Sequence, residues 1–476
     1  MKFSNVLLIL GYGQYYGAEV PLTLGYLAEA LRKHNIQYKI IDANVLKHNS
    51  TILEAIKDFS PDLIGVSFAS SIMYLKNYSL IETIKNNFST PIIAGGVHIR
   101  AERDLVIQQC QGLDFAMLGE SEDALVELCQ GRTFKEIKGL YFKENGRIIF
   151  SGERDCLTDL DNIVFPKYIG FSSYYKNREI TLFDPQVINV LKMPLLTSRG
   201  CPYNCIYCSN ADHGKVFRFR SPKNVVDEIQ YWANIGYKRF GIVDANFTQN
   251  RDRVMLICDE IKRRGLVNLD FTVGPRADLV DYELLKEMKS VGFNRVFLNF
   301  EGSNNKTLKA LNRRCNIDEV ERGVEAAFKL KMAVATTFLL GVPGQTWEDI
   351  EDIFRLCDKY RFDSLNFLYL TPMRGTPLFE WVTKNNLLFY SPENYLNTKI
   401  PWGKIHYETD ILSKEKAQKA MKIGFSYRDR YFRTAKREQY AKYGKFTSEA
   451  IAIILTFRMK IFRKIRKILS NMRRIE

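Results

Sequence analysis

The 476-residue sequence has little cysteine and no long apolar run. Its nine cysteines are too few for a disulfide scaffold and odd in number, so we expect a reducing, cytoplasmic setting in which cysteine serves metal binding or catalysis. No stretch reaches the roughly 18 apolar residues of a membrane-spanning helix. The first apolar run, Val6 to Leu10, is too short for a signal peptide and predicts a buried strand. Apolar (46%) and charged (26%) contents near the globular average exclude a disordered chain.

The surplus of positive charge belongs to the C-terminal tail. The chain has 69 Lys and Arg against 54 Asp and Glu, and 19 of these basic residues but only 5 acidic ones lie in residues 411–476. Between Ile451 and Leu469, large apolar residues recur every three or four positions, which predicts an amphipathic helix with a cationic face. Its basic residues are Arg458, Lys460, Arg463, Lys464, Arg466 and Lys467. Such a helix favours an anionic membrane surface, with packing on the protein or on a second subunit, or nucleic-acid binding, as alternatives.

Residues 1–130 alternate short apolar runs with amphipathic stretches. The runs that predict strands are Asn5–Leu10, Tyr38–Ile41, Leu63–Phe68, Pro91–Ala94 and Phe115–Leu118. Strands that are apolar on both faces and separated by helices predict an α/β fold with a doubly wound, Rossmann-like parallel sheet. Gly11, Gly13 and Gly17 follow the first strand, but the third glycine comes one residue too late for a dinucleotide-binding pattern. The sequence therefore disfavours NAD or FAD.

The rest of the chain divides into three parts. Residues 131–190 are interpreted as a linker that contains a hairpin with its turn at Asn145 and Gly146. Residues 191–385 contain six strand–helix units, which predict a partial βα (TIM-like) barrel with its site at the carboxyl ends of the strands. These strands are expected at Leu195–Thr197, Phe240–Val243, Leu269–Val273, Arg295–Phe300, Ala333–Leu340 and Ser364–Tyr369. Residues 386–476 are expected to form a helical region that ends in the basic tail.

The strongest motif is a group of three cysteines after the first barrel strand. Cys201, Cys205 and Cys208 are close enough in sequence for three thiolates to meet one centre. Iron–sulfur clusters are usually held by four thiolates, so three leave one iron open to a small molecule. A zinc site formed with His213 is the alternative. The remaining cysteines, at 110, 129, 156, 258, 315 and 357, are too scattered for ligand spacing and are interpreted as small buried residues.

The CxxxCxxC spacing, with Tyr207 before the last cysteine, resembles the radical S-adenosylmethionine (SAM) superfamily. The resemblance covers about residues 190–385. Four further segments resemble, in order, the second-strand segment facing the methionyl amine, the helix after the third strand, the fourth-strand segment whose Glu meets the ribose, and the fifth-strand segment near the adenine. These segments are 241–247, 281–292, 299–303 and 338–346.

This resemblance implies that Cys201, Cys205 and Cys208 hold a catalytic [4Fe–4S] cluster whose open iron chelates SAM. An electron from a donor such as flavodoxin or ferredoxin would then cleave SAM to a 5′-deoxyadenosyl radical that abstracts hydrogen from a substrate. The residues implied in SAM binding are Tyr207, Asp244, Asn246, Arg276, Glu301, Gly341 and Pro343. In this interpretation Glu301 accepts from the ribose hydroxyls, Asp244 accepts from the methionyl ammonium and Arg276 pairs with the carboxylate.

Each of these assignments has a structural alternative. Asp244 and Asn246 could cap the following helix. Arg276 could form a surface ion pair. Gly341 and Gly344 could serve only the geometry of a turn.

The first domain, placed ahead of such a barrel, resembles the cobalamin-binding domain of the cobalamin-dependent branch of the superfamily. The segments 21–31, 64–68, 92–98 and 118–122 carry this resemblance, and glycines at strand ends let a bulky ligand approach the backbone. The implied contacts are Ser67, Gly95, Gly96, His98, Gly119 and Glu120. The Asp-x-His-x-x-Gly motif, whose His binds cobalt in other cobalamin proteins, is absent, so we expect no His below the cobalt. A cofactor-free domain is the alternative.

The sequence thus predicts a cobalamin-dependent radical SAM enzyme, interpreted as a methyltransferase that acts on an unactivated carbon of a hydrophobic, lipid-like small molecule. Relatives with the same two domains form rings or rearrange their substrates, so a cyclase or an isomerase is an alternative. The non-enzymatic alternative is a zinc-stabilised adaptor that binds a membrane or nucleic acid. We expect a cytoplasmic protein, with contact to the inner face of the membrane through the tail.

Overall fold

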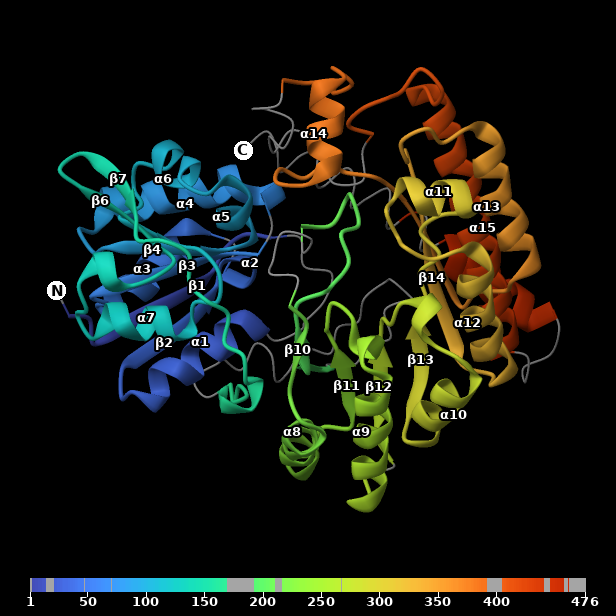
Figure 1. The fold of residues 1–476 in the computed structure, drawn as a ribbon, viewed down its shortest axis with the longest axis horizontal. Coiled ribbons are helices and arrows are strands. Elements are labelled where there is room, and N and C mark those ends of the chain that lie inside the picture. The colour runs from blue at the N-terminus through green and yellow to red at the C-terminus, as the bar shows by residue number, and fades with distance from the viewer. Residues whose placement is uncertain are drawn as a thin grey trace.

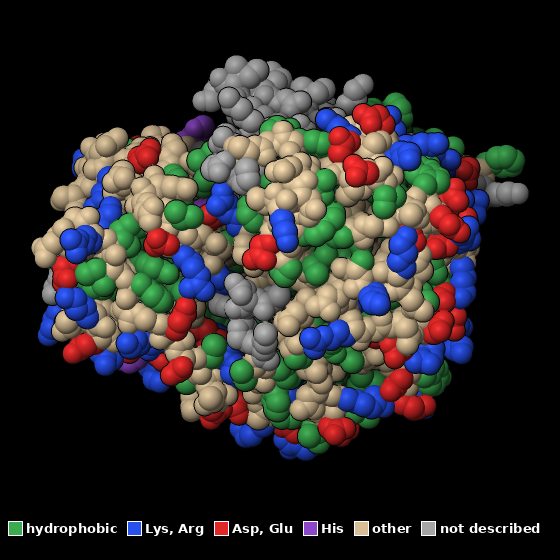
Figure 2. Space-filling view, turned by 45° about the horizontal axis from the view of Figure 1, so that its top comes forward, with side chains coloured by type: hydrophobic (Ala, Val, Ile, Leu, Met, Phe, Trp, Pro, Cys, Tyr) green, Lys and Arg blue, Asp and Glu red, His purple; other side chains and the backbone are tan. Residues whose placement is uncertain are grey.

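A computed structural model describes residues 2–13, 21–46, 48–69, 71–168, 192–209, 216–266, 268–391, 405–440, 446–457 and 461. Two α/β lobes lie side by side, the first drawn from blue to cyan and the second from green to red (Figure 1). On the face shown in Figure 2, Lys and Arg side chains are interspersed with Asp and Glu side chains, in line with the nearly neutral body of the chain. None of the described helices is long and apolar enough to cross a membrane.

The first lobe is built on a seven-stranded sheet with the order β2-β1-β3-β4-β5-β6-β7. Its strands are β1 (Asn5–Leu10), β2 (Gln37–Asp42), β3 (Leu63–Phe68), β4 (Ile92–Gly96), β5 (Phe115–Met117), β6 (Leu140–Glu144) and β7 (Arg147–Phe150). The first five strands run parallel, which confirms the doubly wound sheet. The order reverses between β1 and β3, and ligands of such sheets bind at the carboxyl ends of the strands near this point.

The predicted hairpin is present, and it belongs to the first sheet. Asn145 (φ 51°) and Gly146 (φ 74°) both adopt the left-handed conformation that a tight two-residue hairpin turn requires. β6 pairs antiparallel with β5, so the hairpin extends the sheet instead of lying within a separate linker. The domain boundaries predicted at residues 130, 190 and 385 stay predictions.

Helices cover both faces of this sheet because successive residues of each strand point to opposite faces. Leu7 and Ile9 contribute to one apolar cluster, whereas Leu8 and Leu10 contribute to the other. The helices are α1 (Leu22–Lys33), α2 (Ala43–Leu46), α3 (Asn49–Phe59), α4 (Tyr74–Asn87), α5 (Val97–Glu102), α6 (Leu105–Gln109) and α7 (Glu122–Cys129).

The second lobe contains the predicted partial barrel. Six parallel strands follow one another in chain order: β8 (Met193–Leu195), β11 (Arg239–Ile242), β12 (Asp270–Val273), β13 (Phe293–Phe297), β14 (Ala333–Leu340) and β15 (Ser364–Tyr369). Within the described residues β8 and β15 pair with no further strand of this sheet, so the barrel is open. A short antiparallel pair, β9 (Ser198–Arg199) and β10 (Arg218–Phe219), lies beside it.

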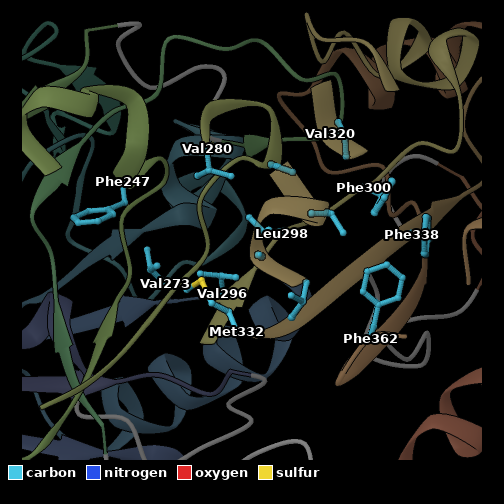
Figure 3. Packing of buried hydrophobic residues seen from close by; sticks show 14 of the residues in the cluster. Phe247, Val273, Val280, Val296, Leu298, Phe300, Val320, Met332, Phe338 and Phe362 are labelled. Carbon is cyan, nitrogen blue, oxygen red and sulfur yellow. The ribbon is translucent and has the colours of Figure 1, made fainter. Parts of the chain in front are cut away.

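Helices pack around the strands through a core rich in phenylalanine (Figure 3). Phe271 stacks between Phe240 and Phe293, with ring centroids 5.4 Å and 4.8 Å apart. The helices are α8 (Pro222–Asn234), α9 (Arg251–Arg263), α10 (Tyr282–Ser290), α11 (Asn305–Ala310), α12 (Ile317–Lys329), α13 (Trp347–Lys359) and α14 (Pro377–Lys384). Each begins after a polar residue whose side chain accepts a backbone N–H of the first turn, which satisfies one otherwise unpaired donor.

The C-terminal region begins with α15 (Lys414–Gln439), which packs on β15. Gly424 permits this contact, because a Cβ at this position would lie 2.5 Å from the ring of Phe367. The predicted tail helix is seen over residues 446–457 and at 461, and all six of its predicted basic residues lie outside the described residues.

Candidate functional site

The cysteine motif lies in a loop at the carboxyl end of the second sheet, directly after β8 and β9. Cys205 is buried, Cys201 and Cys208 are partly exposed, and none of the three forms a disulfide with another described residue. Burial raises the pKa of the Cys201 thiol. Because metal ions bind and stabilise the thiolate, such partly exposed thiols are suited to metal binding.

A zinc site would need the three thiols and His213 grouped around one ion. Within the described part of the chain, no three Cys, His, Asp or Glu side chains are grouped to hold one ion. Zinc would need every sulfur at about 2.3 Å from one atom, whereas the thiolates of an iron–sulfur cluster bind different irons and stand farther apart. The fourth ligand of the zinc alternative, His213, lies outside the described residues.

Glu301 lies beside the cysteine loop in a strained backbone conformation. Its φ of 61° is rare for a residue with a side chain, and such strain clusters at functional sites. The Tyr207 hydroxyl donates to Glu301 Oε2, and Arg313 forms an ion pair with the same oxygen at 2.9 Å. Burial and the Glu301 carboxylate raise the pKa of Tyr207 well above its ordinary value, so Tyr207 is the donor.

Asp244 and Asn246 both follow β11, but their side chains differ in the hydrogen bonds that they make. Asp244 accepts from the backbone N–H (2.6 Å) and hydroxyl (2.5 Å) of Thr197 and from the Ser198 hydroxyl (2.6 Å). Burial raises the pKa of this carboxyl. Asp244 thus fixes the chain that enters the cysteine loop. Asn246 Oδ1 is buried without a partner among the described residues, although its Nδ2 donates to Gln249. Asn246 stands at the N-cap of the short 3-10 helix Phe247–Gln249 without a side-chain cap hydrogen bond, and α9 is capped by Asn250.

Arg276 forms an ion pair, as the structural alternative expects, but the pair is buried and does not lie at the surface. It pairs with Asp278 at 2.8 Å, donates to the Arg313 carbonyl at 2.7 Å and lies 3.7 Å above the ring of Tyr203. Because Tyr203 belongs to the cysteine loop, these contacts tie the loop to the strand ends.

Gly341 serves the geometry of a turn, which is the structural alternative given for it in the sequence analysis. Its φ is 81°, and a Cβ would lie 2.5 Å from the ring of Tyr369, so only glycine fits. Its N–H donates to Gln345 Oε1 at 2.8 Å, and its carbonyl accepts from the Tyr407 hydroxyl. Pro343 follows in the same turn and is partly exposed.

A cavity of about 610 Å³ lies between the two lobes. The first lobe contributes Ser67, Gly95, Gly96, Gly119 and Glu120, five of the six residues that the sequence assigned to cobalamin. The second lobe contributes Leu196, Ser198, Arg199, Gly200, Val243 and Ala245, which lie next to the cysteine motif and to Asp244. A Cβ at Gly95 or Gly119 would contact nothing within 4 Å, so both glycines leave room at the cavity wall. No histidine is among the described residues that line it.

Ion pairs join the two lobes at this cavity. Glu120 pairs with Arg218 at 2.7 Å and with Arg199 at 3.4 Å, and Arg199 also pairs with Glu122 at 2.6 Å. Burial would raise the pKa of Glu120, but the two guanidinium groups hold it below its ordinary value. Glu120 is therefore ionised and connects the lobes in addition to lining the cavity.

His98 does not line the cavity, contrary to its place among the predicted cobalamin contacts. It is buried in an aromatic cluster, stacked on Phe68 and Tyr74 with centroids 5.5 Å and 4.8 Å away. Its Nε2 lies 3.0 Å from the Tyr78 hydroxyl. Burial lowers the pKa of His98 to about 3, so the ring is neutral and structural.

Sequence reasoning missed Arg199, Arg218 and Arg313. Arg199 precedes the cysteine motif by two residues, a position that could have drawn attention to it. Arg313 has no such signal, because the sequence does not distinguish it from its neighbour Arg314. Only the structure shows that Arg313 is buried and Arg314 is exposed.

Two family models match the chain. The model of the radical SAM superfamily matches residues 195–357, and the model of the B12 binding domain matches residues 12–129. The first range holds the cysteine motif and Glu301, and the second holds Gly95, Gly96 and Gly119 of the cavity wall.

Relatives and solved structures agree with these matches. A protein named an uncharacterized methyltransferase, from Pyrococcus horikoshii, is 30% identical over 405 residues, which are 83% of this chain and 85% of that protein. An anaerobic magnesium-protoporphyrin IX monomethyl ester cyclase from Cereibacter sphaeroides is 26% identical over 81% of this chain and 64% of its own length. The structure of the cobalamin-dependent S-adenosylmethionine radical enzyme OxsB with aqua-cobalamin bound has a TM-score of 0.73 at 16% identity, over 99% of this chain and 75% of that one. This last likeness shows the fold alone.

The position of His98 predicts that its ring stays neutral between pH 5 and 8, because the pKa lies near 3. NMR of histidine-labelled protein tests this, with His98→Phe assigning the signal among the five histidines. In the unfolded chain the ring gains a proton below about pH 6.5. This group's contribution to the free energy of unfolding is therefore full above that pH and is lost as pH falls towards 3. A His98 signal that titrates near pH 6.5 would contradict the buried, neutral ring.

Proposed function

Because the chain belongs to the radical SAM superfamily and carries its B12-binding domain, we propose that it transfers a methyl group to an unactivated carbon of a hydrophobic small molecule. The chain is an enzyme, and its cofactors are a [4Fe–4S] cluster, SAM and cobalamin. The observation that carries the proposal is the cavity lined by Gly95 and Gly119 on one side and by the approach to the cysteine loop on the other. When bound, the cluster and SAM supply radical chemistry and cobalamin supplies a methyl group.

In this proposal Cys201, Cys205 and Cys208 hold the cluster. Asn246 Oδ1 and the Glu301 carboxylate are acceptors of the kind that the ammonium and ribose hydroxyls of SAM require. Asp244 serves by fixing Thr197 and Ser198. Arg276 holds the cysteine loop through Tyr203, and Gly341 and Pro343 form the turn after β14. A one-electron donor such as flavodoxin or ferredoxin completes the requirements.

For cobalamin, the cavity wall fits a large flat ligand. Gly95 and Gly119 open it, and Gly96 is required for a different reason. At Gly96 the φ is 111°, and a Cβ would lie 2.5 Å from the Phe68 carbonyl oxygen. With no histidine among the described lining residues, the wall supports binding without a His ligand to cobalt.

A cyclase is the second candidate outcome, because a relative named a cyclase is 26% identical over 81% of this chain. Both outcomes need the same two sites. Analysis of the product separates them, since methyl transfer adds one carbon to the substrate and ring closure adds none.

The tail supports contact with a membrane surface, which would agree with a lipid-like substrate. In residues 446–457 and 461 the small side chains Ser448, Ala452 and Thr456 are buried. Large apolar side chains are exposed: Phe446 (91%), Ile453 (48%), Ile454 (57%), Phe457 (61%) and Ile461 (41%). Exposed apolar side chains next to a strongly basic segment are typical of helices that lie on anionic membranes. We include peripheral membrane contact, without spanning, in the proposal.

Replacing Cys201, Cys205 or Cys208 with Ala should abolish the cluster and SAM cleavage together, because a remaining pair of thiolates cannot hold it. Iron, sulfide and 5′-deoxyadenosine are measured after anaerobic reconstitution. Cys258→Ala, at a buried cysteine of α9, is the control and should keep all three. Stoichiometric zinc without sulfide in the wild-type protein would contradict the assignment.

Gly95→Leu should block cobalamin uptake, because its side chain would fill the open space at the cavity wall. Gly95→Ala adds only one carbon and should retain most of the uptake. Cobalamin is measured by absorbance after gel filtration, and circular dichroism checks the fold. Full uptake by a folded Leu variant would show that cobalamin binds elsewhere.

The full chain should co-sediment with vesicles that contain phosphatidylserine and should dissociate at high salt. Each basic residue near such a surface contributes about 1 kcal/mol at low salt. Ile454→Ser with Phe457→Ser should weaken the binding, and a chain ending at residue 445 should abolish it. Neutral vesicles are the control. If full and truncated chains both stay in the supernatant, the membrane role is wrong.

A further inference from the structure

The cysteine loop rests on a strained turn that sequence reasoning did not single out. The turn of residues 311–314 follows α11 and contains two left-handed non-glycine residues, Asn312 (φ 55°) and Arg314 (φ 54°). Left-handed conformations at two residues of one turn persist only where surrounding contacts fix the backbone. The contacts of the turn are therefore informative about what it holds in place.

Three successive residues of the turn contact three successive residues of the cysteine loop. The Leu311 carbonyl accepts from the Ile206 N–H at 3.2 Å. Asn312 Nδ2 donates to the Asn204 carbonyl at 2.8 Å.

The third contact is at Cys205, the loop residue between Asn204 and Ile206, where Arg313 Nη1 lies 3.7 Å from Cys205 Sγ. The turn thus brings a guanidinium group to the buried cysteine of the motif.

The guanidinium group of Arg313 contacts both this sulfur and the Glu301 carboxylate. Only 7% of the residue is exposed, and the same Nη1 lies 2.9 Å from Glu301 Oε2. Its Nε is buried without a partner among the described residues. A guanidinium group stays protonated in proteins, so this is a fixed cation in a water-poor site, where its field is weakly screened.

We propose that Arg313 is a positioning residue whose cation, held between Cys205 and Glu301, raises the reduction potential of the cluster and orients Glu301 for SAM. The inference rests on the proposed assignment of the cluster to the three cysteines. Reduction adds one electron from the donor to the cluster and makes or breaks no bond. A fixed cation beside a ligand sulfur stabilises the more negative, reduced state, and groups around the sulfurs are known to set such potentials.

The chain supplies a matched control one residue away. Arg314 lies in the same turn but is exposed, so water screens its charge. Arg314→Gln removes the same charge as Arg313→Gln without touching Cys205 or Glu301.

Two substitutions should shift the potential in opposite directions. Arg313→Gln should lower the midpoint potential of the SAM-free cluster, with about a tenfold change in the reduction equilibrium, or about 59 mV. Glu301→Gln should raise the midpoint potential, because the Arg313 cation loses the carboxylate that partly neutralises it. Arg314→Gln should leave it unchanged, and Arg313→Lys, which keeps the charge, should lie between the first variant and the wild type. The measurement is an anaerobic redox titration followed by EPR.

SAM binding to the oxidised cluster gives a second readout. Arg313→Gln should weaken it about tenfold because Glu301 loses its orientation. Iron and sulfide per chain and the circular dichroism spectrum of each variant show whether the cluster and the fold are intact. If the glutamine variant at 313 does not fold, the rise in Glu301→Gln still tests the charge pair.

The outcomes separate this inference from the proposed function. A wild-type protein that binds no iron and sulfide overturns the cluster assignment. A wild-type protein with a cluster, whose potential changes neither in Arg313→Gln nor in Glu301→Gln, overturns the role of Arg313 alone. A shift of equal size in Arg314→Gln does the same, because it would show a general effect of surface charge.

Discussion

The site depends on one constraint: parallel strands bring their carboxyl ends to the same edge of a sheet. In the first lobe this edge carries the turns at Ser67, Gly95 and Gly119, and in the second it carries the cysteine loop. Because both edges border one cavity, residues more than 100 positions apart in the chain meet there. Neither sheet alone could enclose this volume.

Polar contacts hold the two edges at a fixed separation. On one side Arg199 and Arg218 pair with Glu120 and Glu122, and elsewhere Arg374 pairs with the buried Glu102 at 3.1 Å. Buried ion pairs contribute less to stability than their Coulomb energy suggests, but losing one partner leaves an unpaired charge and is costly. Such pairs therefore fix one arrangement of the lobes more than they strengthen it.

Much of the fold could be predicted because it follows from local patterns. The strands of both sheets are short apolar runs separated by amphipathic helices, and all eleven predicted strands are present within a few residues. The cysteine motif was equally local. The predictions that were wrong concern features set by tertiary contacts. The Asn145–Gly146 turn predicts a hairpin but cannot say that β6 pairs with β5. His98 stands beside a glycine turn, yet the face of α5 buries it among aromatic rings.

Dependence on tertiary contacts also explains why the roles of the charged residues could not be predicted from the sequence. Asp244 follows its strand at the position expected for a ligand contact, but Thr197 and Ser198 already supply its hydrogen bonds. Arg313 and Arg314 are the same amino acid in one turn, and only the packing of the cysteine loop buries the first. Which charge acts at a site depends on its desolvation, and desolvation is a property of the assembled structure.

The shared cavity also has a consequence for reactivity. Radical and redox chemistry requires that water be kept from the reacting atoms. Cys205 is already buried by the strand ends and by the turn of residues 311–314, whereas Cys201 and Cys208 are partly exposed. Ser198 and Gly200, which lead into the loop, line the cavity between the lobes. A ligand that fills this cavity therefore lies against the residues that lead into the cysteine loop.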